Sequence, residues 1–292
     1  MSKAKVWVVL GITVLAFAAG CTSSRAAEVL RIGLIPAEDQ REMLRQYEGI
    51  IEYLEESVGM EIKPFVATDY SGVIEAMRSG KLDVAYFGPF SYILAADVAN
   101  VEAFAVPMRS DGRTTYNSII ITHAESGIKS ISDLKGKTFA FVDPASTSGH
   151  LFPRAMLQKA GIDPEKDFSS MVFAGGHDAV ELAVKNRKVD AGADSDKTYD
   201  RMVKDGLIDP KVNLIIAKSD PIPGSPWAWR RDLPDDLKGK FKTAILELGE
   251  KRPEILAGLS GGIAGYAEAK DADYNVIRET AKILNLDLKS LD

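Results

Sequence analysis

The stretch Asp-Pro-Ala-Ser-Thr-Ser-Gly-His at residues 143–150 carries three hydroxyl side chains followed by a glycine. It lies between an apolar run and a segment with helical spacing. Free N–H groups, the positive end of a helix dipole and hydroxyl donors would meet there, and such a combination can bind an oxyanion without lysine or arginine. Plain N-capping needs only one Ser or Thr. The cluster therefore predicts an anion site.

The elements that must position this cluster alternate along the chain. Apolar runs predict buried strands at residues 30–36, 82–88, 118–122, 137–143 and 212–217. Helical spacing occupies residues 41–57, 71–78, 149–160, 178–186 and 237–251. This alternation predicts an α/β fold of parallel sheets with helices on both faces. Ligands of such sheets bind beyond the carboxyl ends of the strands, where the hydroxyl cluster stands.

An internal repeat indicates two similar lobes. Residues 70–76 and 81–85 align, at a constant offset of about 107 positions, with residues 177–183 and 188–192. Tyr70 and His177 then occupy equivalent loops and could face each other across a cleft. Chance similarity between two α/β segments remains an alternative at this point.

The first twenty residues have the features of an export signal. Lys3 and Lys5 precede an apolar run over residues 6–19, and Ala-Ala-Gly-Cys ends at Cys21. The run is shorter than the roughly 20 residues that span a bilayer. The pattern resembles a lipoprotein signal, with cleavage after residue 20, a lipid on Cys21 and a linker over residues 21–27. Typical lipoproteins have leucine where Ala18 stands, so cleavage near residues 26–27 and an uncleaved anchor remain alternatives.

Composition limits the partners. The 292 residues are 46% hydrophobic and 27% charged, which suits a globular chain of two domains. Cys21 is the only cysteine, so no disulfide can form within the chain. The formal net charge is −6 and becomes more negative once the leader is removed, which argues against nucleic acid as a partner.

Three motifs resemble the substrate-binding proteins of phosphonate, phosphite and phosphate ABC transporters. They are Asp-Pro-Ala-Ser-Thr-Ser-Gly-His-Leu-Phe-Pro at 143–153, Ala-Thr-Asp-Tyr-Ser-Gly-Val at 67–73 and Ala-Gly-Gly-His-Asp-Ala-Val at 174–180. The likeness extends over about residues 30–249 and includes Tyr-Phe-Gly-Pro at 86–89 and Ser-Asp-Pro-Ile-Pro-Gly-Ser-Pro at 219–226. It implies a type II periplasmic-binding-protein fold, with two α/β lobes joined by a hinge of two crossings.

The resemblance also implies a function. Such a protein closes on its ligand outside the cytoplasm and delivers it to the permease and ATPase of an ABC importer. It catalyses nothing and needs no cofactor or metal. We accordingly expect a monomer in the periplasm or on the extracytoplasmic face, held to the membrane by its lipid.

Carried over position by position, the resemblance names six ligand-binding residues. The donors to the phosphorus-bound oxygens would be Ser146, Thr147 and Ser148. Tyr70 and His177 would make the remaining contacts to these oxygens, and Tyr116 would be a tyrosine at the crossover between the lobes. The simpler interpretations are that Tyr70 and Tyr116 are half-buried aromatic residues and that His177 is a histidine at a helix start.

One departure from the family bears on specificity. Members that hold an aminoalkyl phosphonate neutralise its ammonium group with carboxylates, and those two positions fall here on Lys197 and Ser225. Asp194 or Asp196 could substitute if the loop shifts. We therefore expect a ligand without an amine, namely phosphite, phosphate or a small alkylphosphonate.

Two other functions remain alternatives at this point. An exported phosphatase or esterase could use Ser148 with His177, but no Gly-x-Ser-x-Gly elbow surrounds Ser146 or Ser148, and no metal-ligand spacing or phosphate loop occurs. A ligand-sensing protein would use the same cleft and differ only in its partner.

The lobe boundaries follow from the repeat and the resemblance. Lobe one is expected over residues 28–120 and 218–292, and lobe two over residues 121–217, with crossings near 119–123 and 217–221. Trp227 and Trp229 are expected in the core. Helices at 247–259 and 273–284 could belong to either lobe.

Overall fold

The computed structural model describes residues 29–259 and 261–286. The expected signal peptide, Cys21 and the linker at 21–27 lie outside the described residues. Within the described ranges, no helix combines the length and the apolar character needed to cross a bilayer.

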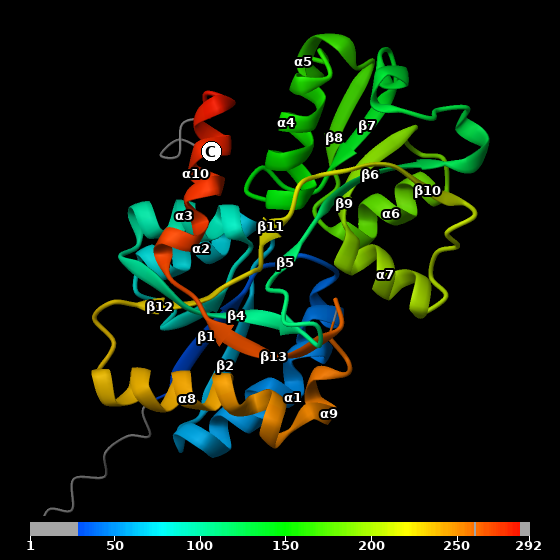
Figure 1. Ribbon diagram of the computed structural model, residues 1–292. Helices are drawn as coiled ribbons and strands as arrows, with labels where there is room; N and C mark the ends of the chain where they lie inside the picture. The colour runs from blue at the N-terminus through cyan, green and yellow to red at the C-terminus, as the bar shows by residue number, and fades with distance from the viewer. Residues whose placement is uncertain (1–28, 260, 287–292) are drawn as a thin grey trace, which may run out of the picture.

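The first sheet has six strands in the order β13-β4-β12-β3-β1-β2 and forms the lower half of the view in Figure 1. Its strands are β1 (Leu30–Leu34), β2 (Ile62–Val66), β3 (Val84–Tyr86), β4 (Val101–Arg109), β12 (Trp227–Arg230) and β13 (Ile263–Glu268). The helices of this half are α1 (Gln40–Val58), α2 (Tyr70–Arg78), α3 (Pro89–Val98), α8 (Asp235–Lys251) and α9 (Pro253–Leu256).

The second sheet has five strands in the order β10-β6-β9-β7-β8. They are β6 (Ser118–His123), β7 (Thr138–Phe141), β8 (Ser170–Phe173), β9 (Ala191–Ser195) and β10 (Asn213–Lys218). The α-helices of this half are α4 (Phe152–Lys159), α5 (Pro164–Asp167), α6 (His177–Lys185) and α7 (Asp196–Lys204). Short 3-10 turns lie at Ala124–Ser126 and Ile131–Leu134, and a π-helical turn, η3, at Thr147–Leu151.

The internal repeat is visible in the topology. The parallel trio β3-β1-β2 of the first sheet has its counterpart in β9-β7-β8 of the second. Helices α2 and α6 begin at Tyr70 and His177 and have nine residues each. The prediction of two similar α/β lobes is therefore confirmed.

The sheets are mixed, so the expectation of parallel sheets was wrong. Beside each parallel trio runs an antiparallel strand, β12 against β3 in one sheet and β6 against β9 in the other. Hydrophobic periodicity indicates that a strand is buried but carries no information on its direction. The strand β10 is also less buried than expected, with Leu214 36% and Ile215 44% exposed, because it lies at the edge of its sheet.

The two crossings between the lobes form a small antiparallel ribbon. It pairs β5 (Thr115–Tyr116) with β11 (Ile222–Pro223), and Figure 1 shows it between the two halves of the molecule. Residues 119–123, expected near the hinge, lie inside β6 because they pair with both β9 and β10. The hinge thus lies a few residues before the expected first crossing and just after the expected second one.

Trp227 and Trp229 lie in the hydrophobic core, as predicted, and are 0% and 6% exposed. The helix expected at 247–259 is interrupted at Arg252, because Pro253 cannot continue α8 and starts α9 instead. The helix expected at 273–284 is α10 (Asn275–Ile283), preceded by a 3-10 turn at Asp271–Tyr274, and it contacts α3 of the first lobe and α4 of the second.

Candidate functional site

The hydroxyl cluster forms the first turn of a helix. Ser146 is the N-cap, and its Oγ accepts the Gly149 N–H at 3.1 Å. The turn η3 then leads directly into α4, so the helix starts two residues before the expected Gly149. Among the described residues no acceptor takes up the N–H groups of Thr147 and Ser148, as is usual for the first residues of a helix. These N–H groups are available to an anion.

Gly149 is required by close packing against the preceding strand. A Cβ there would lie 2.3 and 2.4 Å from side-chain carbons of Val142, and 2.8 Å from Ser146 Oγ. Any larger residue would push the turn away from the strand that positions it. The glycine of the motif thus has a structural role that the hydroxyls do not share.

Further hydrogen bonds hold the turn in place. Ser118 Oγ donates to the Ser148 carbonyl at 2.7 Å, and Asp143 Oδ1 accepts the Ala145 N–H at 2.7 Å. His150 Nδ1 lies 2.8 Å from the Pro144 carbonyl, and burial lowers the pKa of this histidine to about 4, so it is neutral. This turn, residues 146–149 and called the hydroxyl turn below, is therefore fixed from both ends.

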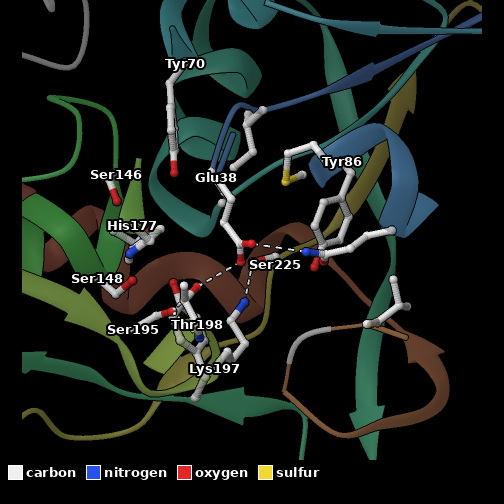
Figure 2. A pocket seen from close by; sticks show the side chains of 18 of the residues that line it. Glu38, Tyr70, Tyr86, Ser146, Ser148, His177, Ser195, Lys197, Thr198 and Ser225 are labelled. Atoms are coloured by element: carbon white, nitrogen blue, oxygen red, sulfur yellow. Dashed lines mark hydrogen bonds between the residues drawn. The ribbon is translucent and has the colours of Figure 1, made fainter. Parts of the chain in front are cut away.

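A pocket between the two lobes opens onto this turn. All six residues predicted to bind the ligand line it, namely Tyr70, Tyr116, Ser146, Thr147, Ser148 and His177. Figure 2 shows Tyr70 on one side and Ser146, His177 and Ser148 on the other. The cavity volume is about 60 Å³. At roughly 10–15 Å³ per water-sized probe, it has room for about four to six non-hydrogen atoms.

The two tyrosines add neutral donors to the turn. The Tyr70 hydroxyl lies near Ser146, and the Tyr116 hydroxyl lies near Ser148 and Thr147. Burial raises the pKa of both phenols above the ordinary value, so they remain protonated. Hydroxyls from both sides of the cleft therefore converge on one small space.

Backbone groups of each lobe also bond to the other lobe. Thr147 Oγ1 accepts the Phe90 N–H at the start of α3, at 2.8 Å. Asp143 Oδ2 accepts the Tyr70 N–H at 3.3 Å, and the Ala37 carbonyl accepts the His177 N–H at 2.8 Å. These bonds join helix starts of one lobe to loops of the other.

Lys197 is a half-buried cation in the same pocket. Its Nζ lies 3.3 Å from Ser225 Oγ and 4.2 Å from the centre of the Tyr116 ring. Among the described residues it forms no ion pair with a carboxylate, although it lines the pocket together with Ser225. Burial lowers the pKa of its ammonium group to about 8. The two positions where relatives were expected to carry carboxylates thus hold a cation and a hydroxyl.

Glu38 was not singled out in the sequence, yet it lines the pocket from the first lobe. Its carboxylate forms an ion pair with Arg201 at 2.5 Å, accepts from Gln46 at 3.1 Å and is 3.2 Å from Thr198 Oγ1 (Figure 2). Its position just after the carboxyl end of β1 is where ligands bind in such sheets, so the strand-end rule would have found it.

His177 is oriented by a buried carboxyl group. Its Nδ1 lies 2.6 Å from Asp194 Oδ1, and the two side chains are 7% and 0% exposed. Burial lowers the pKa of His177 to about 4, which makes the ring neutral. In the described part of the chain no cluster of three or more His, Cys, Asp or Glu could hold a metal ion.

Comparison with known proteins agrees with this geometry. The family model described as "ABC transporter, phosphonate, periplasmic substrate-binding protein" matches residues 32–274. The chain belongs to this family. Its fold is the type II periplasmic-binding-protein fold, its location is extracytoplasmic, and its partners are a small ligand and the components of an ABC transporter. It is a binding protein and not an enzyme.

Two relatives and one solved structure illustrate the similarity. The phosphate-import protein PhnD of Mycolicibacterium smegmatis is 32% identical over 90% of this chain and 88% of its own. The phosphonates-binding periplasmic protein of Escherichia coli is 33% identical over 87% and 76%. A binding protein component of an ABC phosphonate transporter from Pseudomonas aeruginosa superposes with a TM-score of 0.84 at 29% identity, over 89% of this chain and 87% of its own.

Proposed function

We propose that this protein binds a small phosphorus oxyanion without an amine, such as phosphite, phosphate or methylphosphonate, and delivers it to an ABC permease. The relatives named for phosphate import and for phosphonate binding are almost equally similar, at 32% and 33% identity. Overall sequence similarity therefore does not identify the ligand, which has to be inferred from the pocket.

The observation that carries the proposal is the half-buried ammonium group of Lys197. It lines the same small cavity as the hydroxyl turn and has no carboxylate counter-ion among the described residues. A ligand ammonium held about 4 Å from it would be repelled by ~4 kcal/mol at an effective dielectric constant of about 20. That energy corresponds to roughly a thousandfold loss of affinity.

The acidic residues that could have replaced the missing carboxylates are engaged elsewhere. Asp194 is fully buried against His177, and neither it nor Asp196 lines the pocket. Asp196 pairs with Lys218 at 3.2 Å. The charge of Glu38 is compensated by Arg201. The net environment therefore favours an anion over a zwitterion.

The hydroxyl donors support a phosphorus oxyanion of small size. An oxyanion loses its hydration shell on entering a closed cleft, and hydroxyls, free N–H groups and the helix dipole replace that shell. The acidic chain offers no long-range attraction to an anion, so recognition must be local. A volume of about 60 Å³ suits an oxyanion with at most a short substituent.

Isothermal titration calorimetry tests the proposal. Phosphite, phosphate and methylphosphonate are titrated beside 2-aminoethylphosphonate, at the same pH and ionic strength. At least one amine-free ligand is expected to bind at least about 100 times more tightly than the amine. Tightest binding of 2-aminoethylphosphonate would refute the proposal.

We also propose that Cys21 is lipidated after removal of residues 1–20, and that the mature protein is a monomer whose lobes are joined at the β5–β11 ribbon, a few residues away from the expected boundaries. The motif at Cys21 supports the anchor. Mass spectrometry of the protein extracted from membranes should find diacylglycerol on Cys21, and Cys21→Ser should release a protein of monomeric mass. An unmodified Cys21 would contradict the anchor.

A further inference from the structure

A row of buried polar side chains leads from the pocket into the second lobe. His177 at the pocket wall contacts Asp194 on β9, Asp194 lies beside Glu181 on α6, and Glu181 Oε2 accepts from Asn213 Nδ2 at 2.6 Å. Asp194, Glu181 and Asn213 are each 0% exposed, and none of the three lines the pocket. Direct contact with the ligand therefore does not explain them.

The hydrogen bonds around this row require a carboxyl proton. Asp194 Oδ2 and Glu181 Oε1 are buried, and within the described ranges neither accepts a bond from any N–H or hydroxyl group. Two carboxyl oxygens can bond to each other only if one of them is protonated. Because two adjacent buried carboxylates cannot both ionise, they share one proton. Burial raises the pKa of both carboxyl groups, and that of Glu181 more than that of Asp194, so the shared proton resides on Glu181.

The other oxygen of Asp194 then behaves as an ionised acceptor. Its Oδ1 accepts the Ser195 N–H at 2.6 Å and lies 2.6 Å from His177 Nδ1. A carboxyl oxygen that carries its own proton is a poor acceptor for an N–H group, whereas a carboxylate oxygen accepts two of them readily. The proton between His177 and Asp194 is therefore on His177 Nδ1, and the second ring nitrogen, Nε2, has a lone pair.

The surroundings of His177 are consistent with a neutral ring. Ionisable groups near it come from several elements: Glu38 from the segment after β1, Asp143 from the segment after β7, Asp178 and Glu181 from α6, Asp194 from β9 and Lys197 from α7. Burial outweighs the acidic groups among them and keeps the pKa of the ring low. The ring thus offers a hydrogen-bond acceptor to the pocket, whereas the hydroxyl side chains of the turn offer donors.

We propose that the Glu181–Asp194 pair fixes the tautomer of His177, so that Nε2 accepts a hydrogen bond from a protonated ligand oxygen. This inference rests on the proposed function and adds the protonation state of the ligand, a form that carries a P–OH group, which for phosphite and methylphosphonate is the monoanion. His177 selects this form, and Asp194, Glu181 and Asn213 are positioning residues that act through His177.

Methanesulfonate is the decisive probe, because it matches the methylphosphonate monoanion in shape and charge but has no acidic hydrogen. Three oxygens can still accept from the hydroxyl turn, while Nε2 would face a bare oxygen. A site built to pair a ligand hydroxyl rejects an analogue without it strongly. We expect methylphosphonate to bind at least about 100 times more tightly than methanesulfonate at pH 6.5.

Nuclear magnetic resonance gives a second readout that does not depend on the ligand. In ¹⁵N-histidine-labelled protein, nitrogen shifts distinguish a protonated Nδ1 from a protonated Nε2, and His177→Gln assigns the signal among His123, His150 and His177. We expect Nδ1–H for His177. In Asp194→Asn the amide can donate to Nδ1, so the tautomer should reverse and the preference over methanesulfonate should fall at least tenfold.

Glu181→Met removes the donor to Asp194 and should weaken the preference over methanesulfonate, whereas Glu181→Gln is the conservative variant of this positioning residue. Its amide N–H can donate to Asp194 in place of the shared proton, so the tautomer and the preference should be retained. Equal binding of methanesulfonate and methylphosphonate, or a proton on Nε2 in the wild-type protein, would overturn the inference. Absence of binding by every phosphorus oxyanion would instead refute the proposed function.

Discussion

Replacement of Thr147 by valine tests the assigned site most directly. The two side chains have nearly the same shape, so the change removes a hydroxyl and little else. In the structure Thr147 Oγ1 accepts the Phe90 N–H of the other lobe at 2.8 Å, which leaves its own proton free for the ligand. The substitution therefore removes one contact to the ligand and one between the lobes.

The expected magnitude follows from these two bonds. A hydrogen bond to a charged acceptor contributes about 1.5–3 kcal/mol, and one between neutral groups about 0.5–1.5 kcal/mol. Their sum of about 2–4.5 kcal/mol corresponds to a loss of affinity of about 30- to 1,500-fold. Both bonds exist in the closed form, whereas water can bond to the Phe90 N–H when the lobes are apart.

The assay is calorimetric titration of methylphosphonate, or of whichever phosphorus oxyanion binds most tightly. Thr147→Ser retains the hydroxyl and should stay within about threefold of wild type. Thr280→Val makes the same change on α10, where the hydroxyl bonds to the Val276 carbonyl near the surface, and should leave affinity unchanged. A Thr147→Val protein that binds within about threefold of wild type would refute the site.

Three further predictions concern specificity, packing and pH. Lys197→Glu should raise the affinity for 2-aminoethylphosphonate relative to methylphosphonate by at least about tenfold, because repulsion of the ligand ammonium becomes attraction. Competition calorimetry measures this ratio, and an unchanged ratio would contradict the role of Lys197. Gly149→Ala should lower both Tm and affinity because its Cβ would overlap Val142. Gly239→Ala is the control: a Cβ at this position in the interior of α8 meets no atom within 4 Å, so the change should be neutral or stabilising in thermal unfolding. Burial lowers the folded-state pKa of His150 to about 4 from 6.5, so between these values the unfolded chain binds the extra proton and stability falls as pH falls. His150→Gln should therefore make unfolding free energy less dependent on pH between 6.5 and 4, by up to about 1.4 kcal/mol per pH unit, and an unaltered slope in denaturant titrations would exclude this contribution.

Local patterns predicted the repeated units of the fold but not the direction of every strand. The equivalence of Tyr70 and His177 was visible because the same strand–loop–helix spacing occurs twice, and both residues begin a helix. Strands β2 and β8 were not expected, because their mostly exposed positions break the apolar run. The antiparallel strands β6 and β12 follow the crossings between the lobes, and their direction is decided by where the chain returns.

The site could be predicted where its chemistry lies in consecutive residues. The hydroxyl turn is local, so the sequence predicted it; the pocket confirms only that its residues are brought together with Tyr70, Tyr116 and His177. The pairing of Glu38 with Arg201 joins residues 163 positions apart, and that of Glu181 with Asn213 joins residues 32 positions apart. Such contacts depend on tertiary packing, and single-sequence periodicity carries no signal for them.

The bonds that tie helix starts of one lobe to loops of the other have a consequence for kinetics. The Phe90, Tyr70 and His177 N–H groups, together with the Glu38–Arg201 pair, stabilise closure without touching the ligand. Their free energy raises the population of closed protein in the absence of ligand, and a closed cleft admits ligand only after opening. The residence time of the bound ligand is then limited by separation of the lobes as much as by the contacts of the ligand. Substitutions far from the phosphorus atom can therefore change the release rate without altering the groups that recognise the ligand.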